Sequence, residues 1–226
     1  MISVVIPTLN EARRLPALLA DLGREREPAE IVVVDGGSED DSVGIAAAAG
    51  ATVHRTVAGR GRQLRAGAEV AGGEVLLFLH ADSGFPAGGL TQIAEALRAD
   101  PGLVGGNFRI VFDGDDAFSR WLTGFYAWFR RHGLYYGDSG IFVRRKIYEE
   151  LGGIKPMALM EDYEFGRRLE RAGPTCCLDG PLIGSSRRFA GRQPAAIVAG
   201  WLWLHALYFL GVPSERLAAI YRSTRR

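Results

Sequence analysis

Side chains that could do chemistry follow apolar runs in this chain. The first group reads His80-Ala81-Asp82 and comes directly after Leu76-Leu77-Phe78-Leu79. A short apolar run bounded by polar residues is typical of a buried strand, and open parallel sheets bind ligands outside the carboxyl ends of their strands. A carboxylate at such an end offers hard oxygen ligands to a divalent cation. We therefore predict that His80 and Asp82 lie at the rim of an active-site pocket.

Two other predicted strand ends carry polar groups of the same kind. Pro7-Thr8-Leu9-Asn10-Glu11 follows the first strand, and Asp35-Gly36-Gly37-Ser38 follows the second. A carboxylate at the second strand end often hydrogen-bonds a ribose in nucleotide-binding folds. The same Asp-Gly-Gly-Ser sequence also suits an ordinary tight turn. The convergence of three polar strand ends on one edge of a sheet favours a ligand site.

A stretch rich in glycine and arginine, Gly59-Arg60-Gly61-Arg62-Gln63, precedes a predicted helix. Glycines let the backbone approach a phosphate, and a helix N-terminus favours anions. The guanidinium groups of Arg60 and Arg62 add forked hydrogen-bond donors. We favour contact with a phosphate or nucleotide over an ordinary solvated loop.

Two later segments leave their alternatives open. Glu161 and Asp162 begin a predicted helix, where acidic residues are common because they complement the helix dipole. A carboxylate there could instead act as a general base on an acceptor hydroxyl, and spacing alone does not choose between these interpretations. Asp138 and Ser139 lie in a glycine-flanked turn that suits an acceptor site and a structural role equally well.

Strands and helices that must position these groups alternate over the first 110 residues. The predicted strands are 2–6, 30–34, 51–54, 74–79, 107–112 and 140–144. The predicted helices are 42–50, 63–71, 89–99, 118–129 and 160–172, together with one that Asn10 caps and that runs through Leu22. This alternation predicts βαβ units around a mostly parallel sheet. We predict one mixed α/β domain over residues 1–192, followed by an apolar helical appendage over residues 193–226.

Composition narrows the class of protein. The chain has 226 residues and a formal net charge of +1, which gives no support to a nucleic-acid partner. Cys176 and Cys177 are adjacent, which excludes a disulfide framework and indicates a reducing compartment. No signal peptide is apparent, because Met1 runs directly into a strand. Residues 195–212 are nearly long enough to span a membrane, but His205 and the internal aromatic residues favour a buried or interfacial helix.

Taken in this order, the motifs resemble the family-two glycosyltransferases of the GT-A fold. The matching pieces are 4–11, 31–38 with Asp40 and Ser42, His80-Ala-Asp82 and Glu161-Asp162, and the resemblance spans roughly residues 2–190. The chain looks most like a compact bacterial subgroup that carries a Phe-Leu-His-Ala-Asp stretch. The expected fold is a Rossmann-like sheet flanked by helices, with residues 1–105 as its nucleotide-binding half and 106–192 as its acceptor half.

This resemblance implies a nucleotide-diphosphate sugar as donor and Mn²⁺ or Mg²⁺ as cofactor. It implies that Asp82 binds the metal, and that Asp162 is the catalytic base of a direct displacement with inversion, positioned by Glu161. The residues that it places around the nucleotide are Pro7, Thr8, Glu11, Asp35, Gly36, Arg60, Arg62 and Ala81. Asp138 and Ser139 would lie near the diphosphate or the acceptor.

The chain departs from the family pattern at two places. His80 replaces the first Asp of the Asp-X-Asp motif, and imidazole suits Mn²⁺ or Zn²⁺ better than Mg²⁺, or acts through a water. The Gln-X-X-Arg-Trp motif of processive members is absent, so a single transfer is expected rather than polymerisation. Arg187 or Arg188, at a comparable late position, could clamp the diphosphate because guanidinium binds phosphate oxygens well.

Other functions and partners stay open from the sequence. A sugar-phosphate nucleotidyltransferase is disfavoured because no glycine-rich basic loop follows the first strand, and a non-catalytic binding module would explain His80. The acceptor could be a lipid or a polyprenyl phosphate, since the apolar helix at 195–212 and the basic end at 222–226 could hold the chain against an anionic membrane. The same helix could serve as a homodimer contact. We expect a cytoplasmic protein, with the inner face of the cell membrane as its place of contact.

Overall fold

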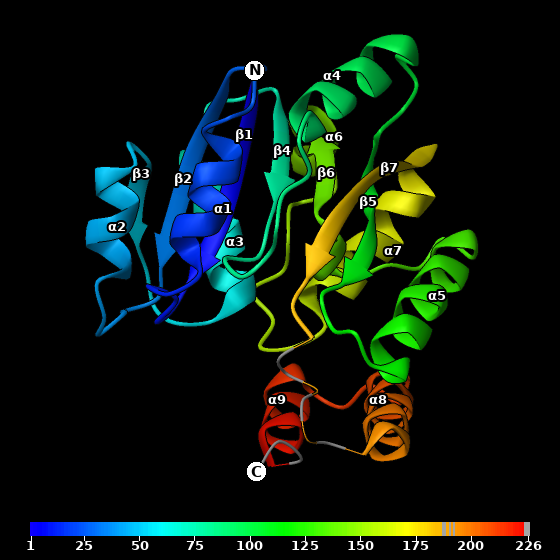
Figure 1. The fold of residues 1–226 in the computed structure, drawn as a ribbon. Helices are drawn as coiled ribbons and strands as arrows, with labels where there is room; N and C mark the ends of the chain where they lie inside the picture. The colour runs from blue at the N-terminus through cyan, green and yellow to red at the C-terminus, as the bar shows by residue number, and fades with distance from the viewer. Residues whose placement is uncertain (187–188, 190, 192, 224–226) are drawn as a thin grey trace.

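The computed structural model describes residues 1–186, 189, 191 and 193–223. These residues build a seven-stranded sheet in the order β3-β2-β1-β4-β6-β5-β7 (Figure 1). The strands are β1 (Ile2–Thr8), β2 (Ala29–Asp35), β3 (Thr52–Arg55), β4 (Val75–Phe78), β5 (Gly105–Phe112), β6 (Ile141–Arg144) and β7 (Thr175–Gly184). Strands β1 to β4 pair in parallel, and β5 pairs in parallel with β7. The predicted α/β class and mostly parallel sheet are confirmed.

Strand β6 runs antiparallel to both of its neighbours, β4 and β5. Because of this reversal, the residues that precede β6 reach the same edge of the sheet as the residues that follow β1, β2 and β4. A short 3-10 turn, η1 (Gly137–Ser139), occupies that position. The topology thus brings the turn at 137–139 to the edge where ligands bind in open α/β sheets.

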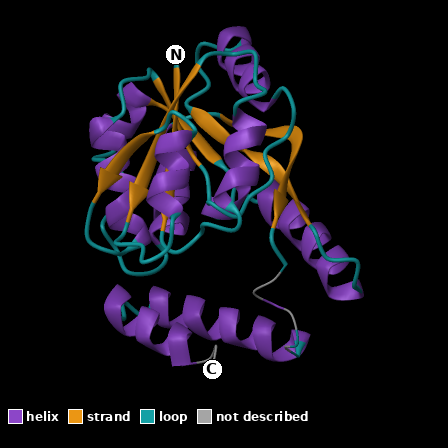
Figure 2. Ribbon diagram, turned by 60° about the vertical axis from the view of Figure 1, so that its left-hand side comes forward, coloured by secondary structure: helices purple, strands orange, loops and turns teal. Residues whose placement is uncertain are grey.

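Helices cover both faces of the sheet (Figure 2). They are α1 (Leu15–Leu22), α2 (Ser42–Ala48), α3 (Arg60–Val70), α4 (Gly89–Ala99), α5 (Ala117–Arg131), α6 (Arg145–Glu150) and α7 (Glu161–Ala172). Side chains alternate between the faces as the pleat requires: Ile6 packs in one core with Ile93 of α4, and Val5 packs in the other with Leu64 of α3 and Phe165 of α7. Burial on both faces explains why the central strands are continuously apolar.

Helices α8 (Pro194–Phe209) and α9 (Ser214–Ser223) lie together below the carboxyl edge of the sheet (Figures 1 and 2). Ile197 of α8 packs with Leu122 of α5, while Leu204 of α8 and Leu217 of α9 pack with Tyr163 of α7. Within the described part of the chain, no helix is both long enough and apolar enough to cross a membrane. On the side that faces the sheet domain, apolar residues of α8 pack against α5 and α7.

Two helix starts differ from the sequence prediction. Asn10 is not the N-cap of the first helix, which begins at Leu15. Asn10 instead adopts a φ of 56°, and its side-chain oxygen accepts a hydrogen bond from the amide of Glu39 at 2.8 Å. Helix α3 begins at Arg60, so Arg60 and Arg62 belong to its first turn and not to a loop ahead of it.

Candidate active site at the carboxyl edge of the sheet

Strands β1 and β2 end side by side, with Thr8 paired in register with Asp35. Both side chains are buried. The Asp35 carboxylate accepts hydrogen bonds from the amides of Gly37 and Ser38, each at 3.1 Å. The predicted turn is therefore present, and it is compatible with ligand binding because a carboxylate has about four lone-pair sites.

Gln63 of α3 joins the two strand ends, a contact that the sequence did not suggest. Its side-chain Nε2 donates to the carbonyl oxygens of Thr8 at 2.9 Å and Val34 at 2.8 Å. A Cβ placed on Gly36 would lie 3.0 Å from this nitrogen and 3.2 Å from the Cα of Ala58. The missing side chain at Gly36 thus lets α3 approach the ends of β1 and β2 closely.

The segment after β2 also fixes the loop after β1. The amides of Asn10, Glu11 and Ala12 donate to Ser38 Oγ, Ser42 Oγ and Asp40 Oδ2 at 3.0, 2.9 and 3.0 Å. These contacts explain why Asp40 and Ser42 accompany the Asp-Gly-Gly-Ser sequence. They hold Glu11 at the same edge as Thr8 and Asp35.

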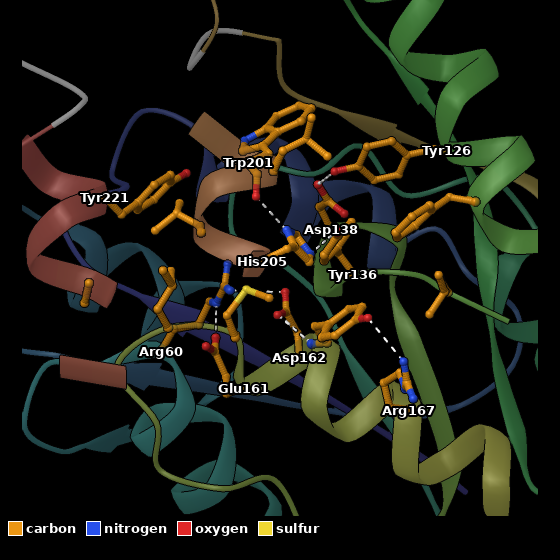
Figure 3. Close-up of a pocket in the computed structure, with 18 of the residues that line it drawn as sticks. Arg60, Tyr126, Tyr136, Asp138, Glu161, Asp162, Arg167, Trp201, His205 and Tyr221 are labelled. Atoms are coloured by element: carbon orange, nitrogen blue, oxygen red, sulfur yellow. Dashed lines mark hydrogen bonds and ion pairs between the residues drawn. The ribbon is translucent and has the colours of Figure 1, made fainter. Parts of the chain in front are cut away.

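An ion cluster joins the starts of helices α3 and α7 (Figure 3). The Arg60 Nε atom donates to Glu161 Oε1, and its Nη2 atom lies 3.1 Å from Asp162 Oδ2. The Glu161 side chain is 1% exposed and that of Asp162 is 9%, whereas that of Arg60 is 35% exposed. Asp162 Oδ2 also accepts from the amide of Gly137 at 2.9 Å. Two neighbouring carboxylates are therefore buried against one guanidinium that still reaches solvent.

The two carboxyl groups differ in acidity because they share this cation unequally. Burial raises the pKa of Glu161. The positive charge of Arg60 lowers this pKa and the negative charge of Asp162 raises it, and the net shift is upward. Burial opposes the ionisation of Asp162 too, but Arg60 and the Gly137 amide outweigh it and hold its pKa below the ordinary value. Asp162 is thus the more acidic carboxyl group of the pair.

His80 lies against the same carboxylate. A Cβ placed on Gly137 would be 3.1 Å from Asp162 Oδ2 and 3.3 Å from His80 Nε2, so both side chains close around that glycine. The Nε2 atom of His80 is buried and has no hydrogen-bond partner among the described residues. Burial, followed by the charge of Arg60, lowers the pKa of His80 to about 4. The imidazole is therefore neutral at pH 7, and this nitrogen faces the site without a protein partner.

Acidification of the metal-free protein should reveal this neutral imidazole. Between about pH 6.5 and pH 4 the unfolded chain binds a proton at position 80 and the folded chain does not. The free energy of unfolding therefore decreases as the pH is lowered through this window. We expect the ¹⁵N and ¹³C shifts of His80 to titrate with a midpoint near 4 in NMR spectra recorded with a chelator. A midpoint for His80 near 6.5 would contradict the burial argument.

Turn η1 supplies a third buried carboxylate. The hydroxyl of Tyr126, on α5, donates to Asp138 Oδ2 at 3.0 Å, and Ser139 Oγ donates to the carbonyl oxygen of Tyr136 at 2.6 Å. Asp138 is 7% exposed. The predicted turn is confirmed, and it carries Asp138 to the same edge as Asp162.

A side-chain hydrogen bond connects helix α8 to Tyr136, the residue that precedes this turn. Tyr136 Oη and His205 Nε2 are 2.9 Å apart, and His205 Nδ1 is 2.8 Å from the carbonyl oxygen of Trp201. Since a carbonyl oxygen only accepts, Nδ1 carries a proton. This arrangement places α8 against the site, a contact that sequence spacing did not indicate.

A pocket of about 710 Å³ opens beside these groups (Figure 3). Its lining includes Arg60, His80, Asp138, Glu161 and Asp162 among the predicted site residues. Six of the residues predicted around the nucleotide lie at or beside the ends of β1, β2 and β4 and, within the described chain, do not line this pocket; they are Pro7, Thr8, Glu11, Asp35, Gly36 and Ala81. Arg62 is exposed, and Ser139 lines a different cavity, next to Tyr126. Arg187 and Arg188 lie outside the described residues.

A divalent cation was expected at His80 and Asp82. Within the described residues, no three His, Cys, Asp or Glu side chains gather closely enough to hold a metal by themselves. The buried Nε2 atom of His80 nevertheless suits a metal ligand, since it is neutral and lacks a protein partner in the described chain. The His80 imidazole thus fits one ligand position of a divalent cation.

Solved structures define the class of fold. A mannosyltransferase from Pyrobaculum calidifontis, solved in complex with GDP-Man and Mn²⁺, aligns with a TM-score of 0.66 at 16% identity, covering 99% of this chain and 73% of that one. S. aureus TarS 1-349 in complex with UDP-GlcNAc aligns with a TM-score of 0.64 at 18% identity, covering 86% of this chain and 60% of the other. At these identities the likeness concerns the fold, which is GT-A.

Sequence comparison then places the chain in a family. Residues 3–156 match Glycosyl transferase family 2, and the chain belongs to that family. An uncharacterised glycosyltransferase of Mycobacterium tuberculosis is 35% identical over 113 residues, 49% of this chain and 50% of the relative. A PGL/p-HBAD biosynthesis glycosyltransferase of Mycobacterium bovis is 38% identical over 103 residues, 42% of this chain and 40% of the relative. The chain thus matches half or less of the length of these relatives, and the predicted family is confirmed.

Proposed function

We propose that the chain transfers a sugar from a nucleotide-diphosphate donor to an acceptor hydroxyl or phosphate, with inversion and as a single transfer. The observation that carries the proposal is the pair of buried carboxylates, Glu161 and Asp162, at the edge where β1, β2 and β4 end. Its family and its GT-A fold support the same reaction. Without a Gln-X-X-Arg-Trp motif, repeated transfer is not expected.

In this proposal the donor nucleotide lies across the ends of β1 and β2. Thr8, Glu11 and Asp35 bind the base and ribose, with Pro7, Gly36 and Ala81 as the adjoining backbone. The rigid turn of Asp35, closed by the amides of Gly37 and Ser38, supports such a role because it fixes the carboxylate before the ligand arrives. The diphosphate then lies towards Arg60 and Arg62 in the first turn of α3.

Asp162 removes the proton of the acceptor hydroxyl as the new bond forms, and Glu161 positions the Asp162 side chain. Its Oδ2 atom is held by Arg60 and the Gly137 amide, and its lowered pKa makes it a weak base in the absence of donor. An incoming diphosphate competes for the partly exposed Arg60, because guanidinium binds phosphate oxygens in the same forked way as carboxylate. Loss of that ion pair raises the pKa of Asp162 towards the range where a base is effective.

A divalent cation, Mn²⁺ or Mg²⁺, would be held by His80 and Asp82 together with the donor phosphates. When bound, it would neutralise negative charge on the departing nucleoside diphosphate. In this proposal His80 contributes its neutral Nε2 atom, and Asp138 lies close enough to orient the acceptor. The proposal also places the reaction in the cytoplasm, at the inner face of the cell membrane, where the exposed Trp203 of α8 and Leu210 directly after it would contact lipid.

Replacing Asp82 by alanine tests the metal site. In the presence of Mn²⁺ we expect the variant to bind nucleoside diphosphate at least about tenfold more weakly than the unaltered protein does. In the absence of Mn²⁺ the two affinities should be equal. Isothermal titration calorimetry measures both values. Asp179→Ala, which removes an exposed carboxylate on β7, is the control. An unchanged Mn²⁺-dependent affinity would remove Asp82 from the metal site.

The donor is identified by a thermal-shift screen of UDP- and GDP-sugars, each with and without Mn²⁺. Binding to the folded state raises the melting temperature in proportion to the logarithm of ligand concentration over Kd. The donor found in this way is then incubated with the protein, and the released products are separated. Nucleoside diphosphate is the expected product. In a parallel incubation with a nucleoside triphosphate and a sugar phosphate, release of pyrophosphate would indicate nucleotidyl transfer instead.

A further inference from the structure

We propose that the acceptor is a neutral amphiphile whose apolar part lies between α5, α8 and α9 and whose hydroxyl reaches Asp162. This inference rests on the proposed function and names the class of its second substrate. It is carried by the pocket of about 710 Å³, which lies within the size range of small-molecule sites. Among the described residues predicted around the nucleotide, Arg60 lines the pocket at its polar end and the others lie beside it, which leaves the apolar part of the pocket to a different molecule.

The walls of the pocket are apolar over most of their extent. Trp121 and Phe125 come from α5, Trp201 and Leu202 from α8, and Ala218 and Tyr221 from α9. Trp121 and Leu202 are 46% and 68% exposed, which leaves large apolar surface in contact with water. An apolar group in the pocket would cover this surface, at a gain of roughly 25 cal/mol per Å² buried.

The apolar walls are continuous with the carboxylate end of the site. Tyr136 lies between the two: its ring stacks on Tyr163, the neighbour of Asp162. Its hydroxyl is hydrogen-bonded to His205 of α8 (Figure 3). The position of α8 is therefore coupled to the catalytic carboxylate through one side chain. A molecule that occupies the apolar end is held at a fixed distance from Asp162, as productive orientation requires.

Charge at the polar end favours a hydroxyl over a phosphate. Three carboxylates line it, from Asp138, Glu161 and Asp162, and Arg60 pairs with two of them. Arg167 and Arg222 also line the pocket, but within the described chain neither forms an ion pair with these carboxylates. With the donor diphosphate at Arg60, a second phosphate beside Asp138 and Asp162 would meet like charges, whereas a hydroxyl would find acceptors for its proton. A fully polar acceptor would in turn leave its remaining hydroxyls against aromatic walls without hydrogen-bond partners. The two ends of the pocket together fit an amphiphile.

Direct binding tests this inference without any turnover. n-Hexyl and n-octyl β-D-glucoside, kept below their critical micelle concentrations, are titrated calorimetrically into the full chain. Because each buried methylene contributes about threefold to fourfold in affinity, octyl glucoside should bind roughly tenfold more tightly than hexyl glucoside. Octyl phosphate should bind more weakly than octyl glucoside, and tighter binding of the phosphate would overturn the assignment of a neutral hydroxyl.

Two neighbouring positions on α8 give a matched pair of variants. Val198 lines the pocket, and Ala199 is exposed and does not belong to its lining. Val198→Trp should fill the pocket and weaken octyl glucoside binding at least tenfold, whereas Ala199→Trp should leave it unchanged. Leu202→Asp, at an exposed position that the fold tolerates, should have the same effect as Val198→Trp. In all three variants UDP or GDP should bind as in the unaltered protein.

A second experiment tests whether the amphiphile is taken from solution or from a membrane. A long-chain alkyl glucoside is presented in phosphatidylcholine vesicles, and binding of the protein is measured by co-sedimentation. Binding in either experiment, lost in Val198→Trp, supports the inference. Equal affinity for both chain lengths, or binding unaffected by both Val198→Trp and Leu202→Asp, overturns it. Nucleotide binding is measured separately. If the unaltered chain bound neither UDP nor GDP, the proposed function would be contradicted, while the result on binding of the amphiphile would still hold.

Discussion

Replacing Asp162 by asparagine is expected to lower the rate of nucleoside diphosphate release by about 10²–10⁴-fold, the usual contribution of a positioned general base. An amide of the same size keeps the shape of the site but cannot take up a proton. The rate is measured with the donor found in the screen, with water or octyl glucoside as the acceptor. Donor affinity should persist, because the nucleotide residues lie at the ends of β1 and β2 and not on α7.

Glu164→Gln is the control for this variant. Glu164 lies on the same helix and is paired with Arg168 at 2.7 Å and Lys155 at 2.6 Å, outside the lining of the 710 Å³ pocket within the described chain. Its replacement should reduce stability slightly and leave the rate unchanged. Circular dichroism and nucleotide binding show whether Asp162→Asn is folded. A folded Asp162→Asn variant with the rate of the unaltered protein would rule out Asp162 as the base.

The sequence was sufficient to predict the strand ends because their signal is local. Buried strands appear as apolar runs, and the rule for open sheets places Thr8, Asp35 and His80 on one edge without knowledge of any contact. Glu161 and Asp162 were found as a motif at a helix start. Their local alternative, complementing the helix dipole, is compatible with the structure too, because they lie in the first turn of α7.

The sequence was insufficient where contacts depend on how distant elements pack. Arg60 and Asp162 are 102 positions apart, and their ion pair depends on the orientation of α3 against α7. Gln63 resembles a solvated helix residue in the sequence, yet it is buried and bridges two strands. The contact between His205 and Tyr136 depends on where α8 packs. A helix that is apolar on all sides has no single buried face, so its sequence does not specify that position. Asn10 was misassigned because a residue typical of N-caps is also typical of left-handed turns.

Replacing Arg60 by methionine is expected to destabilise the protein by about 3 kcal/mol at pH 7, because it leaves Glu161 and Asp162 buried without their cation. The estimate takes the lower end of the usual range, since the Arg60 side chain is partly exposed. Urea unfolding measures the change through its midpoint and slope. Arg60→Lys keeps the charge but not the forked geometry, so it should recover part of the loss.

The pH dependence of Arg60→Met separates lost charge from lost packing. Without the cation the pKa of both carboxyl groups rises, and the folded state then binds a proton that the unfolded state releases above about pH 4.5. The destabilisation should therefore shrink as the pH falls from 8 towards 5. A loss of stability that is constant over this range would indicate packing of the side chain rather than charge.

A second substitution at Glu161 completes the argument about this cluster. Arg60→Met with Glu161→Gln removes one cation and one buried anion, so the double variant should recover most of the stability that Arg60→Met loses. Asp162 keeps its hydrogen bond from the Gly137 amide and can stay ionised. If Arg60 also binds the diphosphate, the double variant should be stable and yet bind UDP or GDP more weakly than the unaltered protein. Full nucleotide affinity in that stable variant would confine Arg60 to a structural role and leave the diphosphate to Arg62 and the metal ligands.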